Sequence, residues 1–380
     1  MDKRIQTVGK MATEAFVELG KLQKGDNKLV KTGLIEIDSH IGGLLPSEII
    51  TISAPSGIGK SHKLYKLLDN LLSECINPDA KDYISLEFSF EMKMLNKILR
   101  KTHSVLGKKK SEILVQEFTE EEKAVIRQYH ESLKDDRRFI CQEPVTVKEF
   151  YEMTDEFCQK YSDKKAIFIS VDHLLIFSDS QKQEAIEKAT DLINRLKLKF
   201  KNVYFILISQ TNRSANLTLA NDRDNSIIPN NTWLFASSFI EMVSSYIIIM
   251  VNPFKAGINE FLKFNPERYN YLSEHFTGVL DKNGKESFDT IGKNFIFVTK
   301  TRESDEPYKN LFIENMNFSD DVLSKMRQEA EERKAPSTLS IAPPPSFDLT
   351  LSLPNTTPSL ILDEYSSPSE AFGDDEDIPF

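Results

Sequence analysis

Residues 49–61 read Ile-Ile-Thr-Ile-Ser-Ala-Pro-Ser-Gly-Ile-Gly-Lys-Ser, and this stretch decides the fold. The β-branched apolar run Ile49–Ile52 predicts a buried strand. Leucines then recur at helical spacing from Leu64 to Leu72, which predicts a helix that begins near Lys60. A glycine-containing loop between a strand and a helix is the structural context of a phosphate-binding loop. The stretch therefore predicts a site for the phosphates of a nucleoside triphosphate.

The residues of this loop have separate expected roles. Gly57 and Gly59 let the backbone curl so that its N–H groups point at phosphate oxygens, and the following helix adds the positive end of its dipole. Lys60 is expected to reach the β- and γ-phosphates, and the Ser61 hydroxyl to bind Mg²⁺. Ala54 stands where the eight-residue pattern has its first glycine, and alanine fits there if its φ is negative. The predicted set for ATP is Ala54, Pro55, Ser56, Gly57, Ile58, Gly59, Lys60 and Ser61.

Two later strands are predicted to end in carboxylates. Residues 81–87 form a short strand ending at Glu87, and the apolar strand 166–172 ends at Asp172. Because the carboxyl ends of parallel strands gather at one edge of a sheet, both are expected beside the loop. Glu87 is placed to orient and deprotonate the water that attacks the γ-phosphate, with Glu91 as the second candidate. Asp172 is expected to help bind Mg²⁺, partly through water.

The rest of the pattern alternates helices and strands. Helices are predicted over 3–24, 92–135, 146–161, 186–200 and 320–334, and strands over 139–140, 203–210, 246–251, 294–299 and 311–313. This alternation predicts an α/β fold, a mostly parallel sheet flanked by helices. Residues 215–236 and 253–293 are polar and interrupt the pattern.

Composition bounds the compartment and the partners. No apolar run approaches the ~20 residues of a membrane span, and the N-terminus lacks the apolar stretch of a signal peptide. Cys75, Cys141 and Cys158 lack metal-ligand spacing and are interpreted as reduced packing residues. The net charge is −10, but the chain from Ala335 onward holds eight acidic residues and no Lys or Arg, so the body is nearly neutral. We expect a cytoplasmic protein without a membrane partner, and charge alone neither indicates nor excludes nucleic-acid binding.

Short motifs surround the loop in a consistent order. They are Thr32-Gly33, Ile35 to Asp38, Gly43-Leu44-Leu45-Pro46-Ser47-Glu48, Ser85-Leu86-Glu87, Ser209-Gln210-Thr211-Asn212-Arg213 and Lys300-Thr301-Arg302. With the loop they resemble the ATPase domain of DnaB-type replicative helicases, which often replace the first loop glycine by Ala. The resemblance implies a RecA-like P-loop NTPase core over residues 32–334. It also implies a ring-shaped homo-oligomer, a hexamer, that moves on single-stranded DNA by hydrolysing ATP.

The same resemblance implies roles for single residues. Glu87 matches the catalytic base of the family, and Gln210 matches a residue that couples the γ-phosphate to the DNA-binding loops. Lys300 and Arg302 match a pair that reaches the ATP of the neighbouring subunit, with the Arg as a finger supplied in trans. Arg213 and Arg223 lie in the neighbourhood of a loop that lines the DNA channel.

The sequence departs from the family pattern in several places. Phe88 replaces a Met, Glu303-Ser304 replaces an Asn-Gly, and Met242–Ser245 replaces an acidic segment. Residues 253–293 are longer than the family leads us to expect and are interpreted as an insertion. Residues 1–31 are expected to form a linker helix, which leaves no room for the family's N-terminal collar domain.

Residues 335–380 are rich in Pro, Ser, Thr and Asp and are expected to be a disordered acidic tail. The tail ends with Phe-Gly-Asp-Asp-Glu-Asp-Ile-Pro-Phe, which resembles the acidic tip of bacterial single-stranded DNA-binding proteins. A terminal Phe can fill an apolar pocket while its carboxylate pairs with an Arg, and acids steer the tail to a basic rim. Asp377, Ile378, Pro379 and Phe380 are therefore the expected contact for replication or repair proteins that recognise such tails.

Two other interpretations stay open at this point. A RecA-like recombinase or recombination mediator shares the core and the loop, and filaments on single-stranded DNA in place of rings would favour it. A scaffold whose nucleotide site only controls assembly is the other, although Lys60, Glu87, Asp172 and Arg302 are all present and argue against it.

Overall fold

The computed structural model describes residues 7–24, 29–90, 92–108, 110–173, 182–221, 227–235, 237–261, 288–301, 311–316 and 320–334. All of these residues belong to one unit of the chain, Met1–Lys334.

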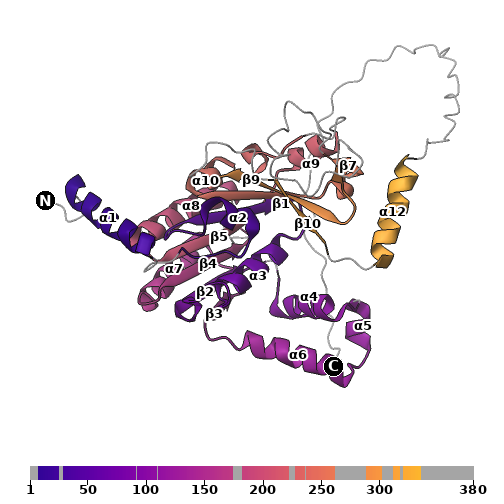
Figure 1. Cartoon of the computed structure of the whole chain (residues 1–380), viewed down its shortest axis with the longest axis horizontal. Coiled ribbons are helices and arrows are strands. Elements are labelled where there is room, and N and C mark those ends of the chain that lie inside the picture. The colour runs from indigo at the N-terminus through magenta and orange to yellow at the C-terminus, as the bar shows by residue number, and fades with distance from the viewer. Residues whose placement is uncertain are drawn as a thin grey trace, which may run out of the picture. The chain divides into compact units, whose positions relative to one another are not determined.

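An eight-stranded sheet forms the centre of this unit, in the order β10-β9-β6-β1-β5-β4-β2-β3 (Figure 1). The strands are β1 (Ile49–Ala54), β2 (Tyr83–Ser89), β3 (Arg138–Cys141), β4 (Ala166–Asp172), β5 (Val203–Gln210), β6 (Tyr246–Val251), β9 (Lys293–Lys300) and β10 (Leu311–Asn315). Neighbouring strands from β6 to β3 are parallel, whereas β9 and β10 are antiparallel. The predicted α/β fold with a mostly parallel sheet is confirmed.

Helices cover both faces of the sheet, which is why its central strands are apolar throughout. Every residue of β1, β4 and β6 is buried, as expected for parallel strands covered on both faces. One core cluster joins alternate strand residues to α7, α8 and α10, and the other joins the intervening residues to α2 and α3. The helices are α1 (Val8–Lys24), α2 (Ile35–Ile41), α3 (Lys60–Leu71), α4 (Met94–Leu106), α5 (Lys110–Val115), α6 (Glu120–Leu133), α7 (Val147–Lys160), α8 (Lys182–Lys199), α9 (Arg213–Ala220), α10 (Ser237–Val243) and α12 (Asp320–Lys334).

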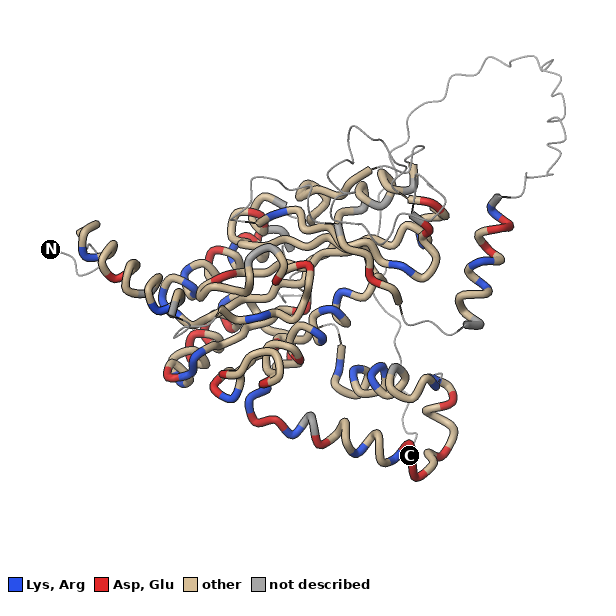
Figure 2. The backbone as a smooth tube through the Cα atoms, viewed as in Figure 1, with Lys and Arg blue, Asp and Glu red and all other residues tan. Residues whose placement is uncertain are grey.

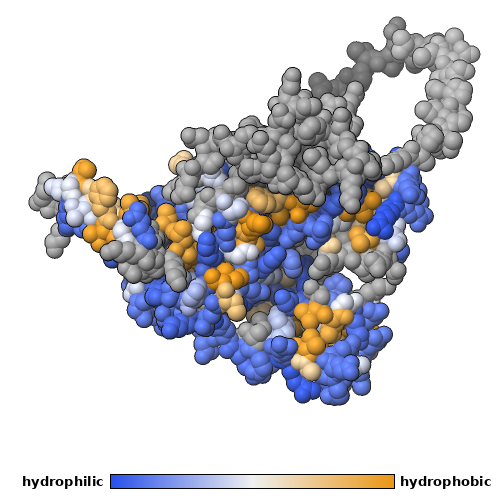
Figure 3. Space-filling view, in the orientation of Figure 1, coloured by the Kyte–Doolittle hydropathy of each residue, from blue (hydrophilic) through white to orange (hydrophobic). Residues whose placement is uncertain are grey.

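Two helical regions expose apolar side chains. On α1, Val8 is 83% exposed and Phe16 is 72% exposed. On α4 and α5, Leu95 is 68% exposed and Val115 is 84% exposed. Figure 3 shows hydrophobic areas over both regions. Every described helix is nevertheless too short or too polar to cross a membrane.

Several local predictions need correction. Strand β2 does not end at Glu87 but continues to Ser89. The stretch 215–236 is not irregular throughout, because the Asn212 side chain accepts a hydrogen bond from the Ala215 N–H and caps helix α9. Helix α1 passes through Gly20 and ends at Lys24.

The polar stretch 253–293 also contains regular structure where it is described. It holds a 3-10 turn, η4 (Pro253–Ala256), and a two-stranded sheet of β7 (Glu260–Phe261) and β8 (Phe288–Asp289). Residues 262–287 lie outside the described residues.

The cysteines are all free but do not share one environment. Cys158 is buried and Cys141 is half-buried, whereas Cys75 is exposed. Burial raises the pKa of the Cys158 thiol to about 12. The packing interpretation therefore holds for Cys158 and is wrong for Cys75.

Candidate nucleotide-binding site

The loop between β1 and α3 has the backbone that a phosphate cradle needs. Gly57 has a φ of +77° and Gly59 a φ of +110°. A Cβ at Gly59 would meet no atom within 4 Å, so conformation and not space requires glycine there. Gly59 is also the residue that precedes the first turn of α3. The free N–H groups at the start of this helix therefore face the loop.

Lys60 is folded into the loop. The residue is 7% exposed, and its Nζ donates hydrogen bonds to the Ala54 carbonyl at 2.9 Å and the Pro55 carbonyl at 3.1 Å. The positive charge is thus held inside the turn, where a phosphate group would lie. Ser61 follows as the second residue of α3.

Polar side chains from other strands brace the outside of the loop. Asn294 on β9 donates from Nδ2 to the Ile58 carbonyl at 3.2 Å, and Asn252 donates to Asn294 Oδ1 at 3.0 Å. Lys255 in η4 donates from Nζ to the Gly57 carbonyl at 2.7 Å. Because these bonds use the carbonyls, they leave the N–H groups of the loop for a ligand. The sequence analysis missed all three braces, since their positions in the sequence are remote from the loop.

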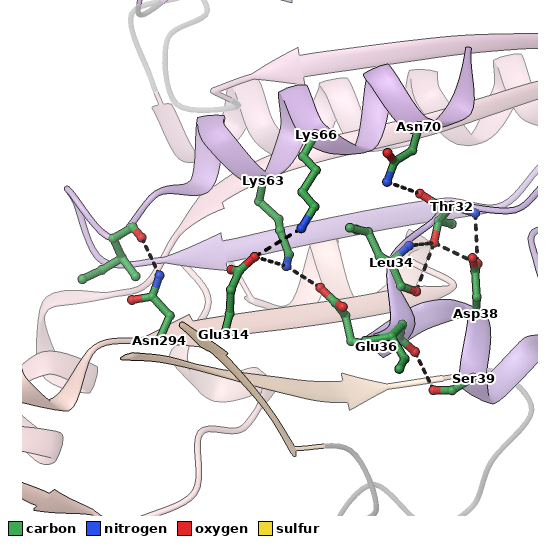
Figure 4. A network of polar contacts seen from close by, with 12 residues as sticks. Thr32, Leu34, Glu36, Asp38, Ser39, Lys63, Lys66, Asn70, Asn294 and Glu314 are labelled. Atoms are coloured by element: carbon green, nitrogen blue, oxygen red, sulfur yellow. Dashed lines mark hydrogen bonds and ion pairs between the residues drawn. The ribbon is translucent and has the colours of Figure 1, made fainter. Parts of the chain in front are cut away.

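The motif that precedes β1 also has a structural explanation (Figure 4). Asp38 accepts hydrogen bonds from the Thr32 N–H, the Thr32 hydroxyl and the Gly33 N–H, at 2.8–2.9 Å. Asn70 of α3 donates to the Thr32 carbonyl at 3.1 Å. The Thr-Gly and Asp residues therefore form a polar turn that is fastened to the helix of the phosphate loop.

A buried ion pair fastens the same helix a second time (Figure 4). Lys63 on α3 lies 2.6 Å from Glu36 on α2, Nζ to Oε1, with side chains 3% and 4% exposed. Glu314 on β10 lies 3.3 Å from Lys63 and 3.6 Å from Lys66. Helix α3 is thus held by α2 and by the edge strand β10 at one point.

Glu87 lies at the same edge of the sheet, on β2. Its Oε1 is 2.5 Å from Nζ of Lys97 on α4, and the two side chains are 13% and 9% exposed. Lys97 also lies over the ring of Tyr65 on α3, 4.8 Å from its centroid. Burial raises the pKa of the Tyr65 hydroxyl, and the negative charges of Glu87 and Asp172 raise it further. Tyr65 therefore lies close to both predicted carboxylates.

Asp172 is the last residue of β4 and is fully buried. In the sheet it pairs with Ser89 of β2, so it lies at the carboxyl edge with Glu87. Asp172 and Ser61 together offer a carboxylate and a hydroxyl, which are oxygen donors of the kind Mg²⁺ prefers when phosphate and water complete its shell. The donor set fits Mg²⁺. Among the described residues, no group of three or more His, Cys, Asp or Glu side chains converges as a metal site of its own.

Gln210 is placed next to the loop by the sheet register. It is the last residue of β5 and pairs with Ala54, the first residue of the predicted loop. The Thr211 N–H donates to the Ala54 carbonyl at 3.4 Å. Two residues later α9 begins at Arg213, so a change at Gln210 would reach α9 through a very short connection.

Lys300 lies away from this group. Strand β9 starts beside the loop, where Asn294 contacts Ile58, but it runs antiparallel to β6 and ends with Lys300 paired to Ile247. Six residues of strand separate Asn294 from Lys300, roughly 20 Å. Nζ of Lys300 donates to the Glu241 carbonyl. The lysine is thus at the opposite edge from its own phosphate loop.

The remaining predicted positions are not described in full. The side chain of Arg213 is outside the described residues, as are Glu91, Arg223, Arg302 and the tail residues Asp377, Ile378, Pro379 and Phe380.

Comparison with known proteins agrees with this geometry. A family model described as DnaB-like helicase C terminal domain matches residues 30–253. The structure is similar to a solved structure whose title describes an ATPase domain, at 15% identity and a TM-score of 0.57, covering 82% of this chain and 96% of that chain. It is also similar to "The Structure Of A DnaB-Like Replicative Helicase And Its Interactions With Primase", at 15% identity and a TM-score of 0.54, covering 82% of this chain and 65% of that chain. At these identities the likeness concerns the fold, and this chain spans slightly less than two thirds of the second structure. No curated protein matches the chain.

Proposed function

The chain belongs to the family of DnaB-like helicase C-terminal domains, whose model matches residues 30–253, and from this we propose that it is an ATP-driven replicative DNA helicase. One observation carries the proposal. The phosphate loop, Glu87, Asp172 and Gln210 come from separate strands and meet at one edge of one sheet. This arrangement suits the hydrolysis of a nucleoside triphosphate and the transmission of its state to a neighbouring element.

In the proposed reaction each residue has one task. The N–H groups of the loop and the Lys60 ammonium bind the β- and γ-phosphates of ATP. Ser61 and Asp172 would hold Mg²⁺, which when bound neutralises charge that develops on the phosphates. Glu87 orients the attacking water and accepts its proton. Gln210 lies where it can contact the γ-phosphate and transmit its loss to α9.

We place the finger of each site on the neighbouring subunit. Lys300 ends β9 at the edge opposite its own phosphate loop, and Arg302 follows two residues later. A side chain at that end is too far from its own ATP to act on it, so in a ring it would serve the next subunit. The exposed apolar faces of α1 and of α4–α5 support assembly, since faces of this kind are normally covered by a partner. We propose a homo-hexamer.

Single-stranded DNA is the proposed track of this motor. Arg213, at the start of α9, and Arg223, soon after its end, would contact the phosphates of the strand, because arginine binds phosphate oxygens strongly. The connection from Gln210 to α9 would then link hydrolysis to movement along the strand.

The tail is proposed to recruit partners of the motor. Asp377, Ile378, Pro379 and Phe380 would dock on replication or repair proteins that recognise the tail of a single-stranded DNA-binding protein. The three segments have separate tasks in this scheme: residues 1–31 link, 32–334 form the motor and 335–380 recruit. Such a protein would act in the cytoplasm, at the site of replication.

The test is steady-state ATPase activity with and without single-stranded DNA. We expect DNA to stimulate the wild type, and Glu87→Gln and Arg302→Ala each to lose about 10²-fold or more in kcat. Mixing the two variants should restore activity, because a mixed interface can combine an intact Glu87 with an intact Arg302. The exposed Glu117→Gln is the matched control and should behave as wild type. Hydrolysis that ignores DNA, together with an active Arg302→Ala, would overturn the motor.

A further inference from the structure

The contact between Lys97 and Glu87 is not accounted for by the roles given above. Nζ of Lys97 lies 2.5 Å from Oε1 of Glu87, and only 9% and 13% of the two side chains are exposed. Helix α4 has no acidic residue of its own, and Figure 2 shows only basic and uncharged positions along it. The charge of Lys97 is therefore compensated across the gap between α4 and the sheet, by the residue proposed to act as base.

The surroundings keep this ion pair in one geometry. The ammonium lies against the face of the Tyr65 ring, 4.8 Å from its centroid, and Tyr65 belongs to the helix that follows the phosphate loop. A buried charge pair is expensive to separate, since the remaining charge would be left without compensation. Lys97 thus has a fixed position between the strand of Glu87 and the phosphate-loop helix.

We propose that Lys97 is a positioning residue for Glu87, holding one carboxylate oxygen so that the other is presented to the attacking water. Oε1 is the oxygen that contacts Lys97, and Oε2 accepts no hydrogen bond from any described residue. An ammonium at this distance also keeps the carboxylate ionised and aligned, as a general base requires. The inference rests on the proposed function, in which Glu87 is the base.

The position of Lys97 on α4 gives the contact a second consequence. Leu95, two residues earlier on the helix, is 68% exposed. A partner that presses on this face of α4 would move Lys97 and, with it, the Glu87 carboxylate. Assembly and hydrolysis are linked through one side chain in this scheme.

The experiment compares Lys97→Met, Lys97→Arg and Lys93→Met in the full-length protein. Lys93 precedes the first turn of α4 and its exposed side chain caps nothing, so it is matched in helix and in substitution. The measurements are kcat and KM for ATP with single-stranded DNA, the affinity for a fluorescent ATP analogue, and the thermal unfolding midpoint. We expect Lys97→Met to lose about tenfold or more in kcat, while KM and nucleotide affinity change less than about twofold. Lys97→Arg should recover much of the loss, and Lys93→Met should match the wild type.

Two results would overturn the inference. One is a Lys97→Met protein with wild-type kcat. The other is a loss of nucleotide affinity and thermal stability in proportion to kcat, without recovery in Lys97→Arg, which indicates a purely structural ion pair. If Lys97→Met does not fold, Lys97→Gln replaces it in the same comparison. Glu87→Gln separates the two levels: if it stays active, the proposed base is wrong, whereas an inactive Glu87→Gln beside a fully active Lys97→Met defeats only the role of Lys97.

Discussion

Gly59 illustrates how a single residue sets the chemistry of the site. Its φ of +110° turns the chain into α3, so that the N–H groups which follow have no partner in the helix and remain for phosphate oxygens. Lys60 is the next residue and folds back onto the Ala54 and Pro55 carbonyls. A change at Gly59 therefore alters the orientation of both the N–H groups and the ammonium.

We predict that Gly59→Ala loses stability and nucleotide affinity for conformational reasons alone. The added Cβ would meet nothing within 4 Å, but the φ is one that L residues rarely adopt, so the cost should be about 1–3 kcal/mol. Gly9→Ala in α1 is the matched control, because its Cβ also meets nothing within 4 Å and no positive φ is involved. Urea unfolding and titration with an ATP analogue would measure both variants. Equal behaviour of the two proteins would contradict the argument.

Single residues also show what the sequence can predict. Glu87 and Asp172 could be found because each comes late in an apolar run, and sheet topology gathers such positions at one edge. Lys97, Asn294 and Lys255 could not be found in this way. They belong to a charged helix, to the start of a strand and to a short turn, and only the tertiary fold brings them to the carboxylate or the loop.

At the scale of elements, α3 is the best-anchored helix of the site. Its amino end forms the phosphate loop, and its outer face is tied to α2 by the Lys63–Glu36 pair and to β10 by Glu314. Asn70 ties it further to the turn at Thr32. Phosphate binding needs a rigid cradle, and these contacts oppose movement of the helix when ligand binds or leaves.

We predict that Lys63→Met destabilises the fold strongly and that Lys66→Met does not. Both lysines contact Glu314, but Lys63 also pairs with Glu36 in a site where both side chains are 4% exposed or less, whereas the Lys66 side chain is 49% exposed. Removing one member of a buried pair should cost about 3–5 kcal/mol, and an exposed pair less than about 1 kcal/mol. Urea unfolding monitored by circular dichroism would measure the difference. A small effect of Lys63→Met would mean that Glu36 finds another partner.

Element by element, the sheet was more predictable than its surroundings. Apolar runs predicted β1, β4, β5 and β6 because strands covered on both faces have no polar alternation. The start of 215–236 was predicted as irregular because its composition is polar, yet the Asn212 side chain provides a cap that nucleates α9. Strand β2 was ended too early at Glu87, since a carboxylate was taken to mark the end of the strand and Ser89 still pairs with Asp172.

At the scale of the whole molecule, the exposed apolar face of α1 is the feature that the chain alone does not explain. Four of its side chains, Val8, Met11, Phe16 and Val17, are each more than half exposed. An amphipathic helix normally buries its apolar face. In the proposed ring, that face would be covered by a second copy.

We therefore predict that Phe16→Ser weakens assembly of the full-length protein. Loss of a 72% exposed aromatic side chain from an interface should raise the dissociation constant about tenfold or more. Sedimentation velocity over a range of protein concentrations would show the shift. The control is Leu198→Ser on α8, a 75% exposed residue at another site, which should leave the assembly intact. An unchanged assembly in Phe16→Ser would remove α1 from the interface.

Strand β9 braces one nucleotide site at its beginning and points Lys300 toward the other edge of the sheet at its end. Because a hydrogen-bonded strand hardly shortens or stretches, a pull on its far end is felt at its near end. In the proposed ring the same rod would join the finger of one site to the loop of the next. Two adjacent sites could then not tighten independently, and hydrolysis would proceed around the circle in a fixed phase, as the teeth of an escapement release one at a time.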